Sequence, residues 1–333
     1  MDCKRSYKYS TLRQLLSLIC ILTMMSCSWV KDDYDDCPYG FWLKLNYSYN
    51  ILDVEAAPKY VKDAFVYIYD ADGEYVKRVY ASYEDLTANN YRVRIEGLPE
   101  GYYKFVVWCG IDNQFAVSGK NLTIDDFRLT LLTNGDGNSY NGKLPDLFYG
   151  YLSDTYFDDS YAIHDVDLMK NTNQFSCLIV SIDNSAVMDP YDYDMKIISA
   201  NGTMNAYNQL VSNVAISYEP NQKGSVVFND TEYGNLQGIQ FSIPSLRLMN
   251  ESSDRIVLEK KDNGQKLFDI SLSEYIGMIG QLYSTLGHEV SIQNYLDRQD
   301  YYTVVFYLSD DLERLISLKV NNWQLRSDNH IKL

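Results

Sequence analysis

The chain has 333 residues and a formal net charge of −16, and 46% of its residues are hydrophobic. That length is enough for about two domains, each with its own buried core. The acidic balance disfavours nucleic acid and anionic lipid surfaces as partners, because both repel a negatively charged protein. Tyrosine is unusually common, with 31 residues, and it favours short strands in which the ring packs while the hydroxyl stays wet.

The first 26 residues have the pattern of an export signal. Four basic residues and one acid precede an apolar run over residues 15–25, which is too short to span a bilayer. Small or apolar residues then lead to Cys27, which resembles a bacterial lipobox, where signal peptidase II cuts before the cysteine and the cysteine is acylated. The alternative is an ordinary secretory signal with an incidental cysteine, but no A-x-A-like cleavage site lies nearby. We therefore expect a palmitate-type lipid on Cys27, and several acyl chains there would form a durable membrane anchor.

Residues 27–36 follow as a predicted acidic tether. Asp32, Asp33, Asp35 and Asp36 outnumber a single lysine, Lys31, so the segment cannot bury enough apolar surface to fold. It also resembles the acidic signal that directs lipoproteins of the Bacteroidetes to the outer leaflet of the outer membrane. The sequence leaves both interpretations open. Removal of the leader would bring the net charge to about −19.

Three cysteines remain for the folded part of the chain. Cys3 and Cys20 leave with the signal, and Cys27 is assigned to the lipid. Cys37, Cys109 and Cys177 are odd in number and lack metal-binding spacing, so they form no disulfide framework. Whether two of them pair stays open.

From residue 41 the chain shows the alternation of β-strands. In the first predicted strand, residues 41–49, the side chains of Leu43, Leu45 and Tyr47 share one face. The segment Asp70-Ala71-Asp72-Gly73 is a hairpin turn, since the later oxygen ligands of a calcium loop are missing. The Gly/Asn-rich loop over residues 133–142 has no lysine and is not a phosphate loop. Further strands are predicted at 64–69, 75–81, 91–95, 103–109 and 122–132.

The second half continues in the same style. Strands are predicted at residues 163–169, 174–182, 193–199, 214–218, 225–228, 239–243, 255–259, 266–270, 301–308, 315–320 and 323–325. One helix is predicted after Ser271, where apolar residues recur at helical spacing up to Leu286. Short, regularly spaced strands with one short helix in the second half predict an all-β protein with two β-sandwiches in tandem, residues 37–160 and 161–333.

No catalytic or metal-binding constellation is recognisable. His164, His288 and His330 lie far apart, and His164 falls in an alternating strand where a surface position is the expectation. The carboxylate pairs Asp158-Asp159 and Asp310-Asp311 fall in turn-like segments. No G-x-S-x-G, H-E-x-x-H or C-x-x-C motif is present. We therefore predict no enzyme activity, no metal site and no cofactor.

Several motifs together resemble a known family. They are Asp35-Asp36-Cys37-Pro38-Tyr39-Gly40 before Leu43-x-Leu45-x-Tyr47-x-Tyr49-Asn50, Val66-x-Ile68-x-Asp70-x-Asp72-Gly73, Leu147-Phe148-Tyr149-Gly150, Leu168-Met169-Lys170-Asn171-Thr172-Asn173, Tyr295-Leu296-Asp297-Arg298-Gln299-x-x-Tyr302 and Ile316-x-Leu318-x-Val320-Asn321-x-Trp323. In this order, and behind a lipobox, they are similar to the FimB-like fimbrial anchor and accessory lipoproteins of Bacteroidales, relatives of the fimbrillins. The resemblance covers essentially the whole mature chain.

The resemblance implies two transthyretin-like sandwiches and no catalysis. Stalk fimbrillins of this kind polymerise by strand exchange after a protease removes an N-terminal strand, whereas anchor members keep that strand and stay lipidated. We therefore expect a surface-exposed outer-membrane lipoprotein that anchors or caps a fimbria (pilus) through strand-mediated contacts with fimbrillin-like subunits. The closing segment, residues 323–333, could pair with a neighbour or be an intradomain strand. The alternative function is a cell-adhesion module that binds carbohydrate or peptide through exposed aromatic residues, and burial of Trp42, Trp108 and Trp323 would count against it.

Overall fold

The computed structural model describes residues 40–135, 138–158, 160–182, 187–250, 252–285, 291–309, 311–321 and 323–326. The side chains of residues 279–285 and 323–326 are not described. The chain separates into Met1–Gly40 and one compact unit, Phe41–Leu333. The predicted leader, Cys27, the acidic tether and Cys37 lie outside the described residues.

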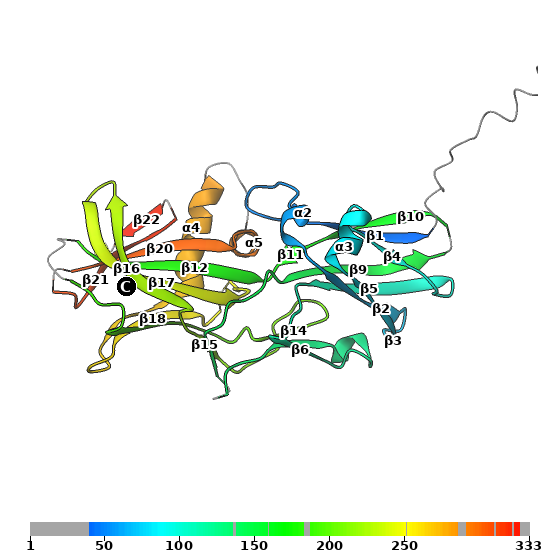
Figure 1. The fold of residues 1–333 in the computed structure, drawn as a ribbon, viewed down its shortest axis with the longest axis horizontal. Coiled ribbons are helices and arrows are strands. Elements are labelled where there is room, and N and C mark those ends of the chain that lie inside the picture. Colours follow the sequence, from blue (N-terminus) through cyan, green and yellow to red (C-terminus); the bar gives the residue numbers. More distant parts are fainter. Residues whose placement is uncertain are drawn as a thin grey trace, which may run out of the picture. The chain divides into compact units, whose positions relative to one another are not determined.

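The first half consists mainly of strands (Figure 1). Its elements are β1 (Phe41–Asn46), α2 (Ala57–Tyr60), β2 (Ala64–Asp70), β3 (Tyr75–Ala81), α3 (Tyr83–Ala88), β4 (Arg92–Ile95), β5 (Gly101–Cys109), β6 (Phe115–Ser118), the 3-10 helix η2 (Ile124–Asp126), β7 (Arg128–Leu131), β8 (Ser139–Tyr140), β9 (Phe148–Phe157), β10 (Ala162–Asp167) and β11 (Met169–Lys170).

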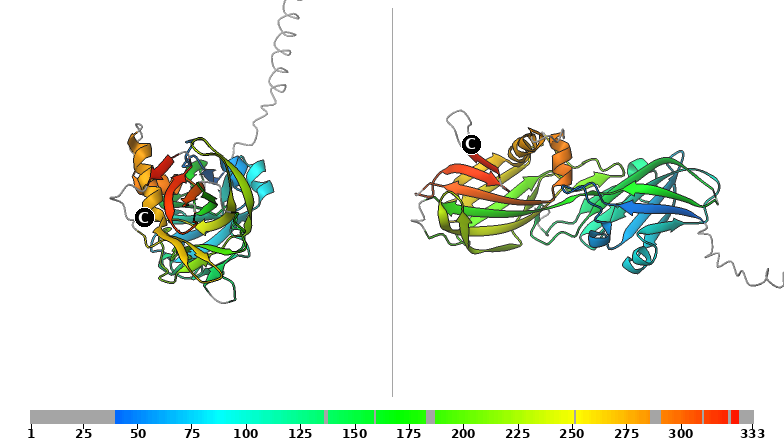
Figure 2. Two further views of the ribbon diagram at one scale, coloured as in Figure 1. Left: turned by 90° about the vertical axis from the view of Figure 1, so that its left-hand side faces the viewer. Right: turned by 90° about the horizontal axis from the view of Figure 1, so that it is seen from above.

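The second half adds two helices among its strands. Its elements are β12 (Thr172–Ser181), β13 (Tyr193–Ser199), β14 (Thr203–Asn205), β15 (Ile216–Tyr218), β16 (Gln222–Asp230), β17 (Gly234–Leu246), β18 (Arg255–Lys260), β19 (Lys266–Ser271), α4 (Leu272–Thr285), α5 (Ile292–Arg298), β20 (Tyr301–Leu308), β21 (Leu315–Val320) and β22 (Trp323–Arg326). The helices α4 and α5 pack against each other (Figure 2).

The strands form five sheets. In the first half, a three-stranded sheet has the order β10-β1-β4 and a five-stranded sheet the order β11-β9-β5-β2-β3. In the second half, the order is β16-β17-β12-β20-β21-β22 in a six-stranded sheet, and a five-stranded sheet of the order β19-β18-β13-β15-β8 also includes β8 of the first half. A small sheet, β14-β7-β6, completes the set. This confirms the expected all-β, sandwich-type fold.

Two large apolar cores hold the sheets together. The first includes Phe41, Leu43, Val66 and Phe105, which come from β1, β2 and β5. The second core is larger and runs through both halves of the chain, since it includes Trp108 from the first half and Phe175 from the second. Alternation explains this division, since successive residues of a strand face opposite sides of its sheet.

Some pairings cross the predicted domain boundary at residue 160. β10 follows residue 160 in the sequence but pairs with β1, and β14 pairs with β7. β8, which lies inside the segment predicted as a loop, pairs in parallel with β15. The division into domains 37–160 and 161–333 stays a prediction.

The helices exceed the single one predicted. α4 lies where the sequence placed it, and α5, α2 and α3 are additional. α3 is held by a capping box, in which Ser82 Oγ accepts from the Asp85 amide and the Asp85 carboxylate accepts from the Ser82 amide. Helices of one or two turns carry too little periodicity to be detected from the pattern of apolar residues.

Candidate functional site

The candidate functional site is the strand β1 together with the two strands that pair with it. β1 runs parallel to β10 on one side and antiparallel to β4 on the other. Both of its backbone edges are therefore paired, and it is the central strand of three. The sequence predicted the strand itself, but its parallel partner, about 120 residues away, carries no local signal.

The inward side chains of β1 fill the core of the first half. Phe41, Leu43 and Leu45 are fully buried, and the following Tyr47 is only 3% exposed, as the alternation predicted. The Phe41 ring centroid lies 5.4 Å from that of Phe105 and 5.3 Å from that of Phe157. Burial of each such side chain contributes about 1.5–3 kcal/mol. Removal of β1 would therefore leave a deep apolar groove with unpaired backbone on both sides.

Hydrogen bonds fix the end of β1. The Asn46 carbonyl accepts from the Leu168 amide at 2.7 Å, and the Tyr47 amide donates to both carboxylate oxygens of Glu55, at 3.0 and 3.1 Å. The Tyr47 carbonyl accepts from the Ala56 amide at 3.0 Å. The loop after β1 is thus folded back onto the strand and holds it in register.

The outward face of β1 carries Trp42. Two guanidinium groups contact its ring, with the carbon of Arg92 5.3 Å and that of Arg94 5.7 Å from the ring centroid. Trp108 is fully buried, and the side chain of Trp323 lies outside the described residues. Trp42 and Trp108 therefore do not form the open aromatic face that the alternative function requires.

The other strand of interest is β22, at one edge of the six-stranded sheet. It pairs antiparallel with β21, so Trp323–Arg326 is an intradomain strand. In the described part of the chain, its other edge has no strand beside it. Residues 327–333 lie outside the described residues.

The histidine and carboxylate candidates are dispersed. His164 is half-buried on β10, where its imidazole stacks on Phe41 with centroids 4.4 Å apart, and burial lowers its pKa. Asp158 and Asp311 each accept a hydrogen bond from a serine two residues away, Ser160 and Ser309, as turn residues do. His288, His330, Asp159 and Asp310 lie outside the described residues.

Metal binding and membrane spanning find no support within the described ranges. No group of three or more His, Cys, Asp or Glu side chains there is arranged to hold a metal ion. None of the helices in this part of the chain combines the length and the apolar character needed to cross a bilayer.

Two of the three remaining cysteines lie within the described residues. Cys109 and Cys177 are both buried free thiols, and they lie in different cores. Burial raises the pKa of both thiols well above its ordinary value. They therefore behave as small apolar core residues and not as reactive groups.

Several solved structures have a fold similar to that of this chain. A protein of Bacteroides thetaiotaomicron with a proposed role in polysaccharide binding matches with a TM-score of 0.75 and 26% identity, over 86% of this chain and 98% of that one. A proposed adhesin of the same organism matches equally well, over 88% and 99%. The fimbrial anchor protein Mfa2 of Porphyromonas gingivalis matches with a TM-score of 0.65 and 16% identity, over 87% and 99%. A comparison with curated protein sequences finds no match.

The fold is shared with proteins of the fimbrial anchor and adhesin class. The family model of the fimbrillin-A associated anchor proteins Mfa1 and Mfa2 matches residues 34–329. The chain therefore belongs to this family, and the expected kinship with fimbrial anchor proteins is confirmed. Membership implies association with the cell surface.

Proposed function

We propose that the protein is a non-catalytic lipoprotein of the outer-membrane surface that anchors or caps a fimbria. The observation that carries the proposal is the position of β1, which is paired on both sides and buried on one face. A subunit whose own first strand fills its groove has no place there for a donor strand from another subunit. Such a subunit ends a fibre instead of continuing it.

The N-terminal segment supplies the attachment in this proposal. Cys27 carries the lipid, and the stretch from Cys27 to Phe41 spans at most about 50 Å when extended. The acidic residues of this stretch keep it solvated. The fold is thereby held close to the outer membrane by a tether that continues directly into β1.

Contacts with fimbrillin-like subunits then use strand edges other than those of β1. β22 is one candidate, because in the described part of the chain its outer edge carries no further strand. Strand addition at such an edge supplies main-chain hydrogen bonds, and the alternating side chains supply specificity.

The role of Cys27 is tested by comparing the variants Cys27→Ala and Cys37→Ala in cells. Cys37 is a matched control, since it lies in the same N-terminal segment but outside the lipobox. We expect Cys27→Ala to release both the protein and its fimbriae into the medium, while Cys37→Ala leaves both in the membrane fraction. Unchanged membrane fractionation of Cys27→Ala would contradict the proposal.

The alternative is a module that binds carbohydrate or peptide through exposed aromatic residues. A relative with 26% identity has a proposed role in polysaccharide binding. However, Trp108 is fully buried and the ring of Trp42 is in contact with the guanidinium groups of Arg92 and Arg94, so neither ring is free to stack on a sugar. We therefore retain the anchor function.

A further inference from the structure

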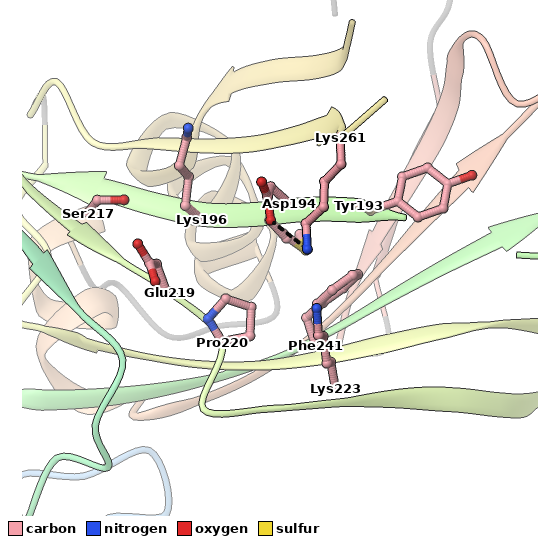
Figure 3. Close-up of a pocket in the computed structure, with 10 residues that line it drawn as sticks. Tyr193, Asp194, Lys196, Ser217, Glu219, Pro220, Lys223, Phe241 and Lys261 are labelled. Atoms are coloured by element: carbon pink, nitrogen blue, oxygen red, sulfur yellow. Dashed lines mark ion pairs between the residues drawn. The ribbon is translucent and has the colours of Figure 1, made fainter. Parts of the chain in front are cut away.

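A polar cavity of about 440 Å³ in the second half of the chain contains charges of both signs. Its lining residues include Lys196, Lys223 and Lys261, and also Asp194 and Glu219 (Figure 3). Lys261 Nζ lies 3.3 Å from the carboxylate of Asp194. Because ammonium and carboxylate groups lie side by side there, the cavity favours neither anions nor cations. A more specific set of contacts surrounds a charged residue elsewhere, at the end of α5.

Arg298 is the last residue of α5, and it joins this helix to the segment that follows β1 (Figure 1). Its guanidinium carbon lies 4.5 Å from the centroid of the Tyr49 ring, and its Nη1 donates to the Asn50 carbonyl at 3.2 Å. The same guanidinium group forms an ion pair with Asp53. The Arg298 carbonyl accepts from the Ile51 amide at 3.1 Å. These contacts fasten one short segment of the first half to the second half.

The segment that Arg298 holds is tied together by its own side chains. Asn50 Nδ2 donates to the Tyr47 carbonyl at 3.0 Å and to the Val54 carbonyl at 2.7 Å. The Glu55 carboxylate accepts from the Ala57 amide at 2.8 Å as well as from the Tyr47 amide. The segment therefore cannot straighten without breaking these bonds, and a pull on β1 is passed on to α5.

β1 lies between these contacts and the N-terminal end of the folded unit. Phe41 begins β1, whereas Tyr49 and Asn50 come just after its other end. All of β1 pairs with β10, and Phe41–Lys44 also pairs with β4. A pull on Phe41 away from the second half therefore acts along the strand and across the hydrogen bonds on both of its sides. Bonds loaded in this way break together, whereas a strand that is pulled sideways loses them one at a time.

We propose that Arg298 is a mechanical brace, which holds the C-terminal end of β1 against α5 so that β1 resists a pull on Phe41 in shear. Arg298 is thus a positioning residue for β1. The inference rests on the proposed attachment through the N-terminal segment, because that attachment makes Phe41 the point where load enters the fold. The brace also gives a role to two sequence motifs that meet in the structure, the one that ends in Tyr49-Asn50 and the one that contains Arg298.

The test is single-molecule stretching of the purified full chain at constant force. One handle is at the N-terminus and the other is inserted in the exposed turn at Asn263, between β18 and β19. We expect Arg298→Ala to raise the unfolding rate under force about tenfold, because it removes the aromatic contact, the hydrogen bond and the ion pair together. If Arg298→Ala does not fold, Asp53→Asn removes the ion pair alone and should raise the rate about threefold.

The matched control is Arg94→Ala. The guanidinium of Arg94 also lies over an aromatic ring, 5.7 Å from the Trp42 centroid, and it also pairs with a carboxylate, that of Glu96 at 2.8 Å. Both of these partners belong to the first half, so they do not connect β1 to α5. The substitution should change the unfolding rate less than about twofold.

The direction of the pull distinguishes a brace from a residue that stabilises the fold in general. With the first handle moved to the exposed turn at Asp72, between β2 and β3, the load does not enter along β1. The effect of Arg298→Ala should then fall below about twofold. The proposal is overturned if Arg298→Ala and Arg94→Ala unfold equally fast when pulled from the N-terminus, or if Arg298→Ala speeds unfolding equally in both directions. The measurement involves no membrane or fimbria, so its failure is distinct from failure of the anchor function, which the fractionation of Cys27→Ala decides.

Discussion

The imidazole of His164 stacks on the ring of Phe41, with centroids 4.4 Å apart and planes 24° from parallel. Phe41 is the first residue of β1, and His164 lies on its parallel partner, β10. The contact therefore joins the N-terminal end of β1 to a strand more than 100 residues later. Substitutions of Phe41 and His164 can therefore measure how strongly β1 is held in its sheet.

Phe41→Ala should lower the free energy of unfolding by about 3–5 kcal/mol, because it opens a cavity in a fully buried position. Trp42→Ala is the matched control on the outward face of the same strand. It should cost about 1 kcal/mol, since it removes mainly the contacts with Arg92 and Arg94. Urea unfolding of both variants measures the difference. Equal losses would mean that β1 is not held by its inward face.

Acid should lower the free energy of unfolding through protonation of His164. Burial holds the pKa of His164 below its ordinary value of 6.5, an effect that Asp165 partly opposes, so the unfolded chain binds the proton more tightly than the folded one. The free energy of unfolding should fall as the pH drops through 6.5 and stop falling below the folded-state pKa. The measurement is the pH dependence of urea unfolding for the wild type and for His164→Gln. Identical slopes near pH 6.5 would contradict this assignment.

The ion pair between Arg247 and Asp297 should matter for stability. The Asp297 side chain is only 8% exposed and accepts from Arg247 Nε at 2.9 Å and Nη2 at 3.0 Å. Asp297→Asn should cost about 3–5 kcal/mol, because it leaves a buried guanidinium without its counter-charge. The exposed pair of Arg94 and Glu96 is the control, and Glu96→Gln should cost less than about 1 kcal/mol. Similar costs in thermal unfolding would refute the distinction.

Cys109 and Cys177 should be free thiols in the purified protein. They lie in separate cores, and their burial keeps both thiols protonated. Alkylation without reductant should label both cysteines in denaturant and neither under native conditions, as read by peptide mass spectrometry. A peptide pair joined by a Cys109–Cys177 disulfide would contradict the structure.

Local pattern predicted much of this fold. The alternation at Leu43, Leu45 and Tyr47 gave the buried face of β1, and the bounds of β3, β13, β20 and β21 match the predicted strands. Each of these depends on residues a few positions apart. The helix α4 was also predicted, because its apolar residues recur at a period near 3.6.

The features that sequence did not predict are non-local. The pairing of β1 with β10 and that of β8 with β15 join segments far apart in the chain, and nothing in either strand specifies the partner.

The most direct test of the anchor account is a mass spectrum of the N-terminal peptide of the protein purified together with fimbriae. If the protein is a lipid-anchored fibre terminus, the chain begins at an acylated Cys27 and continues without a break through Phe41–Asn46. An unmodified Cys27, or an N-terminus beyond Asn46, would contradict it, since the protein would then lack its lipid or its own first strand.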